Sequence, residues 1–237
     1  MNVTFRCYPG LEDILPRPAR ASHAFPDWLK AMPISARDEA FGITVDTVKK
    51  CPPFIDAMGF GFLMPLVADV HVERCEFSWS WTELAGVESL AGINDSFSPV
   101  AVHFNTEVTG TPLFDAELSV IKFNNFWTIE LDEGYSLLVT HPINRFDLPF
   151  RTLTGLVDAD TYRAGFINFP AAWIDREFVG TLAKGTPVAQ CLVVPREPYE
   201  LRWGAIGVDE LADQAQTHDA IRYDTGVYRR EFRKTKK

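Results

Sequence analysis

Proline and glycine interrupt this chain at short intervals, and that feature constrains its fold most. The sequence has 16 prolines and 15 glycines in 237 residues, and they separate short hydrophobic runs along most of its length. Proline is excluded from helix interiors and glycine weakens them, so long amphipathic helices do not fit most of the chain. Short apolar runs between such residues are typical of β-strands. The sequence therefore predicts a mainly β fold.

The predicted strands fill the middle of the chain. We expect them at residues 42–49, 61–66, 69–81, 100–108, 118–123, 127–131, 136–140, 152–157, 165–169 and 188–194. Pro26 and Asp27 favour a helical turn over 25–30, because proline suits a first helical position and an acid suits the positive helix start. Residues 208–223 alone change to a helical period and predict a surface helix.

Size and cysteine spacing bound the class of protein. A chain of 237 residues that is 46% hydrophobic can bury a large core without disulfides or metal. We expect a single domain over 1–237, with an arm and β region in 1–120, a core in 121–200, and a helix and basic tail in 201–237. The four cysteines form no C-x-x-C pair, and we expect them to be reduced thiols of a cytoplasmic protein. No apolar run is long enough to span a membrane.

The charge is uneven along the chain. The net charge is −9, although the last nine residues, R-R-E-F-R-K-T-K-K, hold six of the 23 basic groups. The rest of the chain is therefore more acidic than the total suggests, and it would repel a nucleic-acid backbone. We expect no general nucleic-acid binding, and a solvated tail.

Four segments between residues 127 and 195 carry local signals. Gly134 and Gly185 lie where β-turns need positive φ, and Pro187 fits a strand start or edge. Asp158 and Asp160 follow a hydrophobic strand two residues apart, so they are expected to share a face. The segments are 131–134 (L-D-E-G), 141–148, 155–163 (G-L-V-D-A-D-T-Y-R) and 184–190 (K-G-T-P-V-A-Q).

In order and spacing, these segments resemble the core of the dUTPase and dCTP deaminase superfamily, over about residues 127–195. The resemblance implies a β-clip or jelly-roll-like barrel, here with an N-terminal β extension and a C-terminal helix. The layout of the N-terminal half is also similar to that of proteins carried by phages and bacteria. A homotrimer is implied too, because such folds complete their pockets between subunits.

The resemblance also implies roles for individual residues. Asp158 would orient the attacking water as a general base, with Asp160 as its catalytic companion. Tyr162 would lie under a deoxyribose, although the inserted Thr161 shifts its position relative to the family pattern. Arg145 would meet a phosphate, and Gln190 would either bind ligand or bond to backbone groups at a turn. The resemblance implies Mg²⁺ as cofactor and a nucleotide as ligand.

The sequence departs from that pattern in places, so the function stays open between three classes. No serine stands beside Arg145, no glycine-rich arm closes the chain, and 166–169 lacks the glutamate that deamination needs. The nucleotide-binding or nucleotide-hydrolysing protein is the first class.

The second class is a jelly-roll Fe²⁺ oxygenase, with His71, Glu73 and either His141 or His103 as ligands. The third is a non-enzymatic binding or assembly protein, in which aromatic residues such as Trp79 and Trp81 form an interface. Whether the chain is an enzyme is not decided by the sequence.

Overall fold

The computed structural model describes residues 1–81, 97–116, 118–224 and 226–234. Contacts divide the chain into two compact units. The first comprises Met1–Phe25 and Met58–Arg196, and the second comprises Pro26–Ala57 and Glu197–Lys237. These units do not follow the predicted segments 1–120, 121–200 and 201–237. The single domain stays a prediction.

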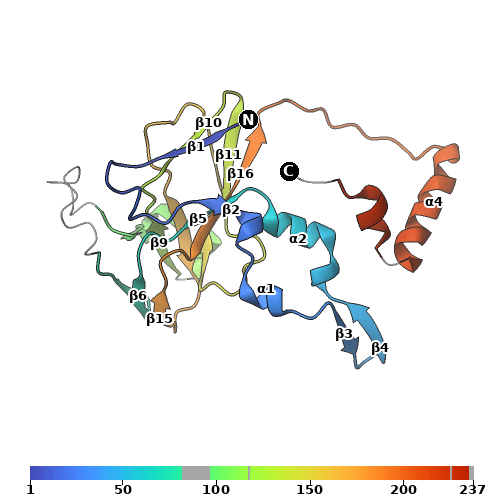
Figure 1. Ribbon diagram of the computed structural model, residues 1–237, viewed down its shortest axis with the longest axis horizontal. Helices are drawn as coiled ribbons and strands as arrows, with labels where there is room; N and C mark the ends of the chain where they lie inside the picture. The colour runs from blue at the N-terminus through green and yellow to red at the C-terminus, as the bar shows by residue number, and fades with distance from the viewer. Residues whose placement is uncertain (82–96, 117, 225, 235–237) are drawn as a thin grey trace. The chain divides into compact units, whose positions relative to one another are not determined.

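Antiparallel strands build the first unit. A five-stranded sheet has the order β13 (Gly155–Val157), β11 (Tyr135–Thr140), β16 (Pro187–Pro195), β5 (Phe62–Pro65) and β2 (Ala19–Arg20). A four-stranded sheet has the order β12 (Phe150–Thr152), β14 (Phe169–Trp173), β9 (Ser119–Phe123) and β8 (Val100–Val102). Figure 1 shows β11 and β16 side by side near the top of the unit, as their pairing requires.

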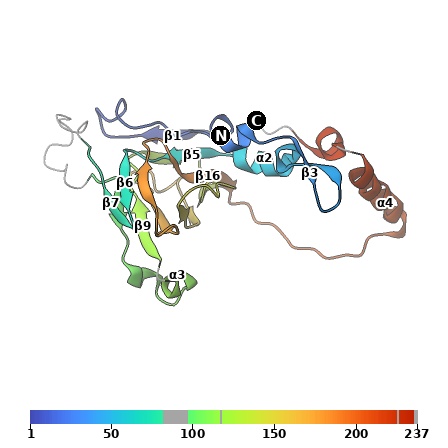
Figure 2. The same ribbon diagram turned by 90° about the horizontal axis from the view of Figure 1, so that it is seen from below.

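Two smaller sheets complete the unit. One consists of β15 (Val179–Leu182), β6 (Val70–Glu73) and β7 (Glu76–Ser78), and β6 and β7 lie next to each other in Figure 2. The other joins β1 (Val3–Arg6) to β10 (Thr128–Leu131). The unit also contains three short helical segments: η1 (Ala21–His23), which follows β2, and η6 (Asn105–Val108) and α3 (Pro112–Asp115), which lie between β8 and β9.

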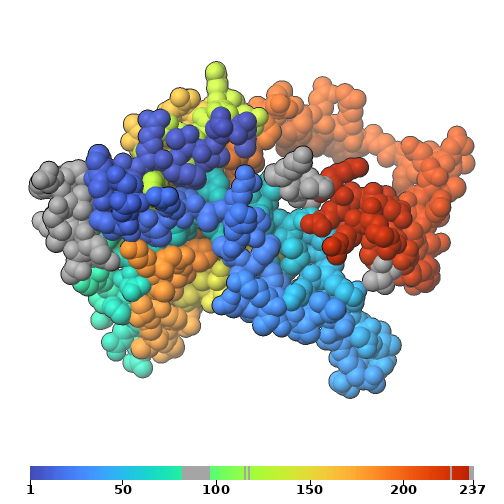
Figure 3. Space-filling model, viewed as in Figure 1, coloured from blue at the N-terminus to red at the C-terminus, as the bar shows by residue number. Residues whose placement is uncertain are grey.

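The second unit is a mixture of short helices and one hairpin. It contains α1 (Asp27–Ala31), the hairpin of β3 (Ser35–Asp38) and β4 (Ile43–Asp46), η2 (Val48–Lys50), most of α2 (Pro52–Gly59), α4 (Val208–Tyr223) and the π-helix η7 (Tyr228–Phe232). The segment 197–207 and nearly all of α4 are exposed; Trp203, for example, is 87% exposed. Residues 197–207 lie within the orange range of the colour bar in Figure 3. No helix among the described residues has the length and apolar character needed to cross a membrane.

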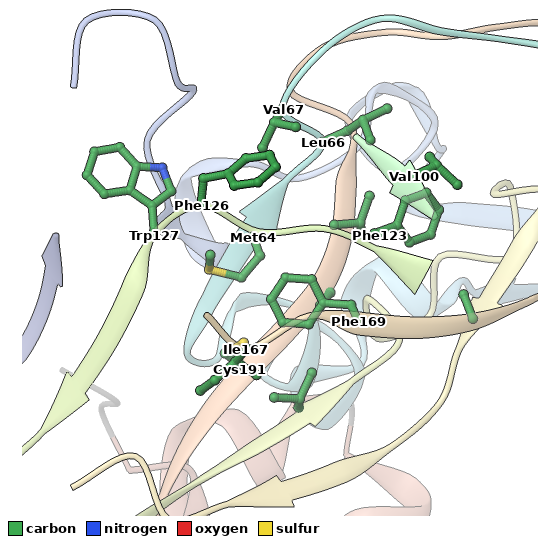
Figure 4. Close-up of a cluster of buried hydrophobic side chains, with 14 of the residues drawn as sticks. Met64, Leu66, Val67, Val100, Phe123, Phe126, Trp127, Ile167, Phe169 and Cys191 are labelled. Carbon is green, nitrogen blue, oxygen red and sulfur yellow. The ribbon is translucent and has the colours of Figure 1, made fainter. Parts of the chain in front are cut away.

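The core of the first unit is aromatic and contains one thiol. Trp173 and Phe150 are fully buried and their ring centroids lie 6.2 Å apart, while Phe123 lies 4.7 Å from Phe150. Figure 4 shows Cys191 beside Ile167 in this interior, and Cys191 is 0% exposed. Burial raises the pKa of the Cys191 thiol far above its usual range. The thiol is therefore held as a small apolar group.

The mainly β fold and the C-terminal helix are confirmed. The predicted helix over 208–223 has the bounds of α4, and its amino end is capped because the Gly207 amide donates to Glu210 Oε2 at 2.8 Å. Gly134 and Gly185 have φ of 87° and 89°, as predicted. β16 begins at Pro187, which confirms its place at a strand start.

Several predicted strands are wrong in their bounds. Residues 69–81 form a hairpin rather than one strand, with Arg74 and Cys75 at its turn in the left-handed region. Residues 152–157 are split between β12 and β13, which belong to different sheets. The strand predicted at 165–169 begins only at Phe169, and that at 100–108 ends at Val102. Over the described strands, each sheet has two end strands, and none closes into a barrel.

Candidate functional site

The turn after β13 places the predicted carboxylates beside β11. β13 pairs with β11 through Val157 and Leu137, so Asp158 comes next to Ser136. The Ser136 hydroxyl donates a hydrogen bond of 2.7 Å to Asp158 Oδ1. Ser136 is 1% exposed, whereas the side chain of Asp158 is 62% exposed. A buried donor therefore holds one oxygen of an exposed carboxylate.

A tight turn follows Asp158 and sets the position of Tyr162. The Asp158 carbonyl accepts hydrogen bonds from the amides of Thr161 at 3.1 Å and Tyr162 at 2.9 Å. The Tyr162 ring lies against Gly165, where an added Cβ would stand 2.1 Å from Tyr162 Cζ. The residue is 50% exposed. Because residue 165 has no side chain, the ring can lie on the backbone with part of its surface open to solvent.

Arg196 bridges the two carboxylates. Its Nη1 lies 2.9 Å from Asp160 Oδ1 and 3.3 Å from Asp158 Oδ1, and its Nη2 contacts Asp160 Oδ2. Nη1 also donates to Ser136 Oγ at 3.3 Å. The Arg196 amide donates to the Gly134 carbonyl at 2.9 Å, which fixes the backbone from which the guanidinium extends. Both carboxylates therefore contact one cation, although they lie in the turn after β13 and not on a strand face.

Asp160 is buried and fully engaged. It is 4% exposed, and its Oδ2 also accepts a hydrogen bond of 3.0 Å from the Gly134 amide. The hydrogen bond from Arg196 is the main cause that lowers the pKa of Asp160 from 3.8 to about 2, against the opposing effect of burial. The same contact raises the pKa of Arg196. Asp160 is therefore a charged partner of Arg196, whereas Asp158 has an oxygen open to a ligand.

The predicted ligand-binding residues Arg145 and Gln190 lie at the other end of β11. Gln190 pairs with Thr140, four residues along the strand from Ser136. At about 3.3 Å per residue this is a separation of roughly 13 Å. Gln190 is 1% exposed, and its amide bonds to two backbone groups, the Phe60 carbonyl at 2.6 Å and the Ile143 amide at 2.9 Å. These contacts match its structural interpretation.

Arg145 lies in a loop built around a second arginine. Its side chain is 13% exposed and forms two hydrogen bonds of 2.8 Å with the carboxylate of Asp147. Arg151 Nη1 donates to the carbonyls of Arg145, at 3.3 Å, and Phe150, at 3.0 Å. A phosphate would thus compete with Asp147 for Arg145.

The residues of the iron hypothesis do not meet. His71 Nδ1 lies 2.7 Å from Thr181 Oγ1 on β15, while His141 Nε2 lies 3.0 Å from the Arg145 carbonyl. Burial, reinforced by the neighbouring arginines, lowers the pKa of His141. Across the part of the chain that the structure describes, no group of three histidine, cysteine or acidic side chains could hold a metal ion. Among the described residues, His71, Glu73 and either His141 or His103 therefore form no metal-binding group.

Sequence reasoning missed two residues of the site, Ser136 and Arg196. Ser136 is a buried hydroxyl directly before the apolar run of residues 137–139, and a buried hydroxyl needs a partner, so its position is a usable signal. Arg196 could be recognised only from the pairing of Tyr135 with Pro195, which brings the end of β16 to the start of β11.

Comparisons with known proteins find matches only among solved structures, and these have low identity and low TM-scores. A scan against family models finds no match, and a search of curated proteins finds none that matches. Among solved structures, a dUTPase from phage phi11 of S. aureus is 17% identical and aligns over 37% of this chain and 72% of its own, with a TM-score of 0.29.

A mutant dUTPase of Staphylococcus bacteriophage 80alpha with dUpNHpp is 13% identical and aligns over 86% of this chain and 96% of its own, with a TM-score of 0.37. The likeness is to a partial and divergent dUTPase-like fold. At identities and TM-scores this low, it carries no argument about function.

Proposed function

We propose that this chain binds a nucleotide at the turn 158–163, with Asp158 as the acceptor for a sugar hydroxyl or a water molecule. The observation that supports this most is the exposed carboxylate of Asp158, which Ser136 and Arg196 hold at 2.7 and 3.3 Å. An oriented and accessible carboxylate is the group that general-base catalysis needs.

The charges around Asp158 support the same proposal. Asp160 neutralises Arg196, so the cluster keeps one negative charge, on the exposed carboxylate. Arg163 lies on the same turn, where its Nε donates to the Asp160 carbonyl and its side chain is exposed. Its remaining donors are suited to a phosphate. A hydroxyl at Asp158 and a phosphate at Arg163 are the two ends of a nucleotide.

Tyr162 supplies an apolar surface on the same turn. Its half-exposed ring rests on Gly165, and rings of this kind stack on bases and sugars. Because Tyr162 and Asp158 share one tight turn, a single ligand can touch both. This is the role that the resemblance implied for Tyr162.

Hydrolysis of the nucleotide is the finer form of the proposal, with Asp158 orienting the water. The described residues contain no group of three histidine, cysteine or acidic side chains that could hold Mg²⁺, so they do not fit a protein-held magnesium site. The proposal extends to a cytoplasmic homotrimer, in which a second copy would cover the exposed Asp158 and Tyr162.

A thermal-shift series tests nucleotide binding. The wild type is measured with dUMP, dUTP and dCTP, each with and without Mg²⁺, because binding to the native state raises the melting temperature. We expect stabilisation by at least one nucleotide, loss of that shift in Asp158→Asn, and no loss in the control Asp132→Asn. Asp132 lies in the neighbouring turn, 46% exposed, and accepts a hydrogen bond of 2.8 Å from the Asn2 amide.

The outcomes separate binding from hydrolysis. A wild type that no nucleotide stabilises would refute the proposal, as would a shift that survives in Asp158→Asn. Release of pyrophosphate from dUTP, absent in Asp158→Asn, would support the hydrolytic form.

A specific surface favours the non-enzymatic binding protein as a second candidate. β8 is an end strand, with Val102 79% and Phe104 71% exposed, beside a pocket of about 550 Å³ that Phe77 and Trp79 also line. Exposed apolar residues at a sheet edge are typical of protein interfaces. Concentration-dependent association that Val102→Glu abolishes, without any nucleotide effect, would support this candidate.

A further inference from the structure

The guanidinium of Arg196 touches two carboxylates that differ in exposure. Asp160 is almost completely buried and binds both Nη atoms, whereas Asp158 is mostly exposed and receives only Nη1, at 3.3 Å. The contact with Asp160 therefore fixes the guanidinium of Arg196, and the weaker contact with Asp158 orients the exposed carboxylate.

A second route connects the same two groups. Arg196 Nη1 donates to Ser136 Oγ at 3.3 Å, and that hydroxyl donates onward to Asp158 Oδ1 at 2.7 Å. Since the oxygen accepts from the arginine, its one proton is directed to Asp158. The hydroxyl thus lies between the guanidinium and the Asp158 carboxylate and connects them by hydrogen bonds.

Backbone contacts keep Arg196 itself in place. Its amide donates to the Gly134 carbonyl at 2.9 Å, and Nη1 donates to the Tyr135 carbonyl at 3.0 Å. The side chain is held from both ends, at its backbone and at its guanidinium. Such a rigid, planar donor fork cannot be reproduced by the single ammonium group of lysine.

We infer that Arg196 is a positioning residue for Asp158, acting directly and through Ser136, while Asp160 serves as the fixed counter-charge of Arg196. This inference rests on the proposed function, in which Asp158 meets the ligand. It assigns Asp160 to the support of the site and leaves Asp158 as the one carboxylate of the pair that faces a ligand.

Arg196→Lys tests the inference, with Arg233→Lys as its matched control. Arg233 also forms a two-point pair with an aspartate, through Nε and Nη2 to Asp56 at 3.1 and 2.6 Å. The exposures of the two arginine side chains are similar, 38% and 35%. Both variants replace a guanidinium that binds an aspartate at two points, but only Arg196→Lys loses a contact with Asp158.

Two readouts separate positioning from a structural role. The side-chain carboxyl ¹³C resonance of Asp158 is recorded without ligand, and the affinity for dUMP is measured by titration. In Arg196→Lys we expect a shifted Asp158 resonance and an affinity reduced by about tenfold, the size expected for losing a hydrogen bond to a charged group. In Arg233→Lys we expect neither change.

An unchanged Asp158 resonance in Arg196→Lys would overturn the inference whether or not dUMP binds. A shifted resonance in a protein whose wild type binds no nucleotide would instead reject the proposed function and keep the positioning. If Arg196→Lys does not fold, Ser136→Ala removes the hydroxyl that connects Arg196 to Asp158 and leaves the pair of Arg196 with Asp160 intact. An Asp158 resonance that stays unshifted in Ser136→Ala would then refute the inference.

Discussion

Replacement of Gly61 by alanine tests a close approach between two backbone segments of the first unit. Gly61 has a φ of 72°, and a Cβ on it would stand 2.1 Å from the carbonyl oxygen of Cys191 and 3.1 Å from its carbonyl carbon. Both neighbours are backbone atoms of β16, so no side-chain rotation can relieve the contact. The next residue, Phe62, pairs with Cys191, and the β5–β16 pairing would have to shift.

The cost of Gly61→Ala has two parts. A non-glycine residue in the left-handed region costs roughly 1–2 kcal/mol. Displacing the end of the pairing loses about two backbone hydrogen bonds at roughly 1 kcal/mol each, and partial exposure of apolar side chains adds to this. We therefore expect the free energy of unfolding to fall by about 3–5 kcal/mol.

Gly185→Ala isolates the steric part. Gly185 has a φ of 89°, but nothing lies within 4 Å of an added Cβ. We expect this variant to lose only about 1–2 kcal/mol, the conformational part. Urea unfolding followed by tryptophan fluorescence measures both, since Trp127 and Trp173 are buried in this unit. If the two variants lose the same stability, the clash at Cys191 does not govern the cost and the reasoning is wrong.

Three further predictions concern buried polar groups. Gln190→Leu leaves two partly buried backbone groups without their partner, so the free energy of unfolding should fall by about 2–4 kcal/mol in urea titrations; a loss near zero would show that other groups replace the amide. The pKa of Asp160 is lowered to about 2 in the folded protein, so the unfolded chain takes up the proton at a higher pH than the folded protein does. The stabilisation from the charged Asp160 is therefore complete above about pH 4 and is lost as the pH falls through about 2. The stability difference between wild type and Asp160→Asn should therefore shrink over that window, and a constant difference would contradict the ion pair. Thr152→Val removes the hydroxyl that donates to the Val188 carbonyl and should cost about 1–3 kcal/mol by the same titration, whereas an unchanged midpoint would show that this bond contributes nothing.

Local signals explain the parts of the fold that the sequence predicts well. Positive φ at Gly134 and Gly185 follows from glycine itself, and the bounds of α4 follow from residues within the helix and its cap. The turn at Arg74 and Cys75 was missed because neither residue prefers the left-handed region. The helix α2 was missed because its two leading prolines resemble a loop, although the first turn of a helix tolerates proline.

Long-range pairing explains what the sequence could not predict. β1 pairs with β10 through Val3 and Leu131, and no local pattern in either segment predicts which strand it pairs with. The same limit applies to the site. Strand period predicts a common face for Asp158 and Asp160, but both lie in the turn after β13, and the cation that contacts them follows β16, which pairs with β11.

The thiol of Cys191 has a consequence for how the protein can be studied. Because it is 0% exposed and its pKa is raised by burial, a thiol reagent can reach it only when the strands around it open. Cys51 is exposed and reacts without such opening, so it serves as an internal reference for reagent reactivity. Cys191 is therefore a native probe of local opening at the β5–β16 pair. The rate at which its thiol is modified measures how often that pair separates under native conditions.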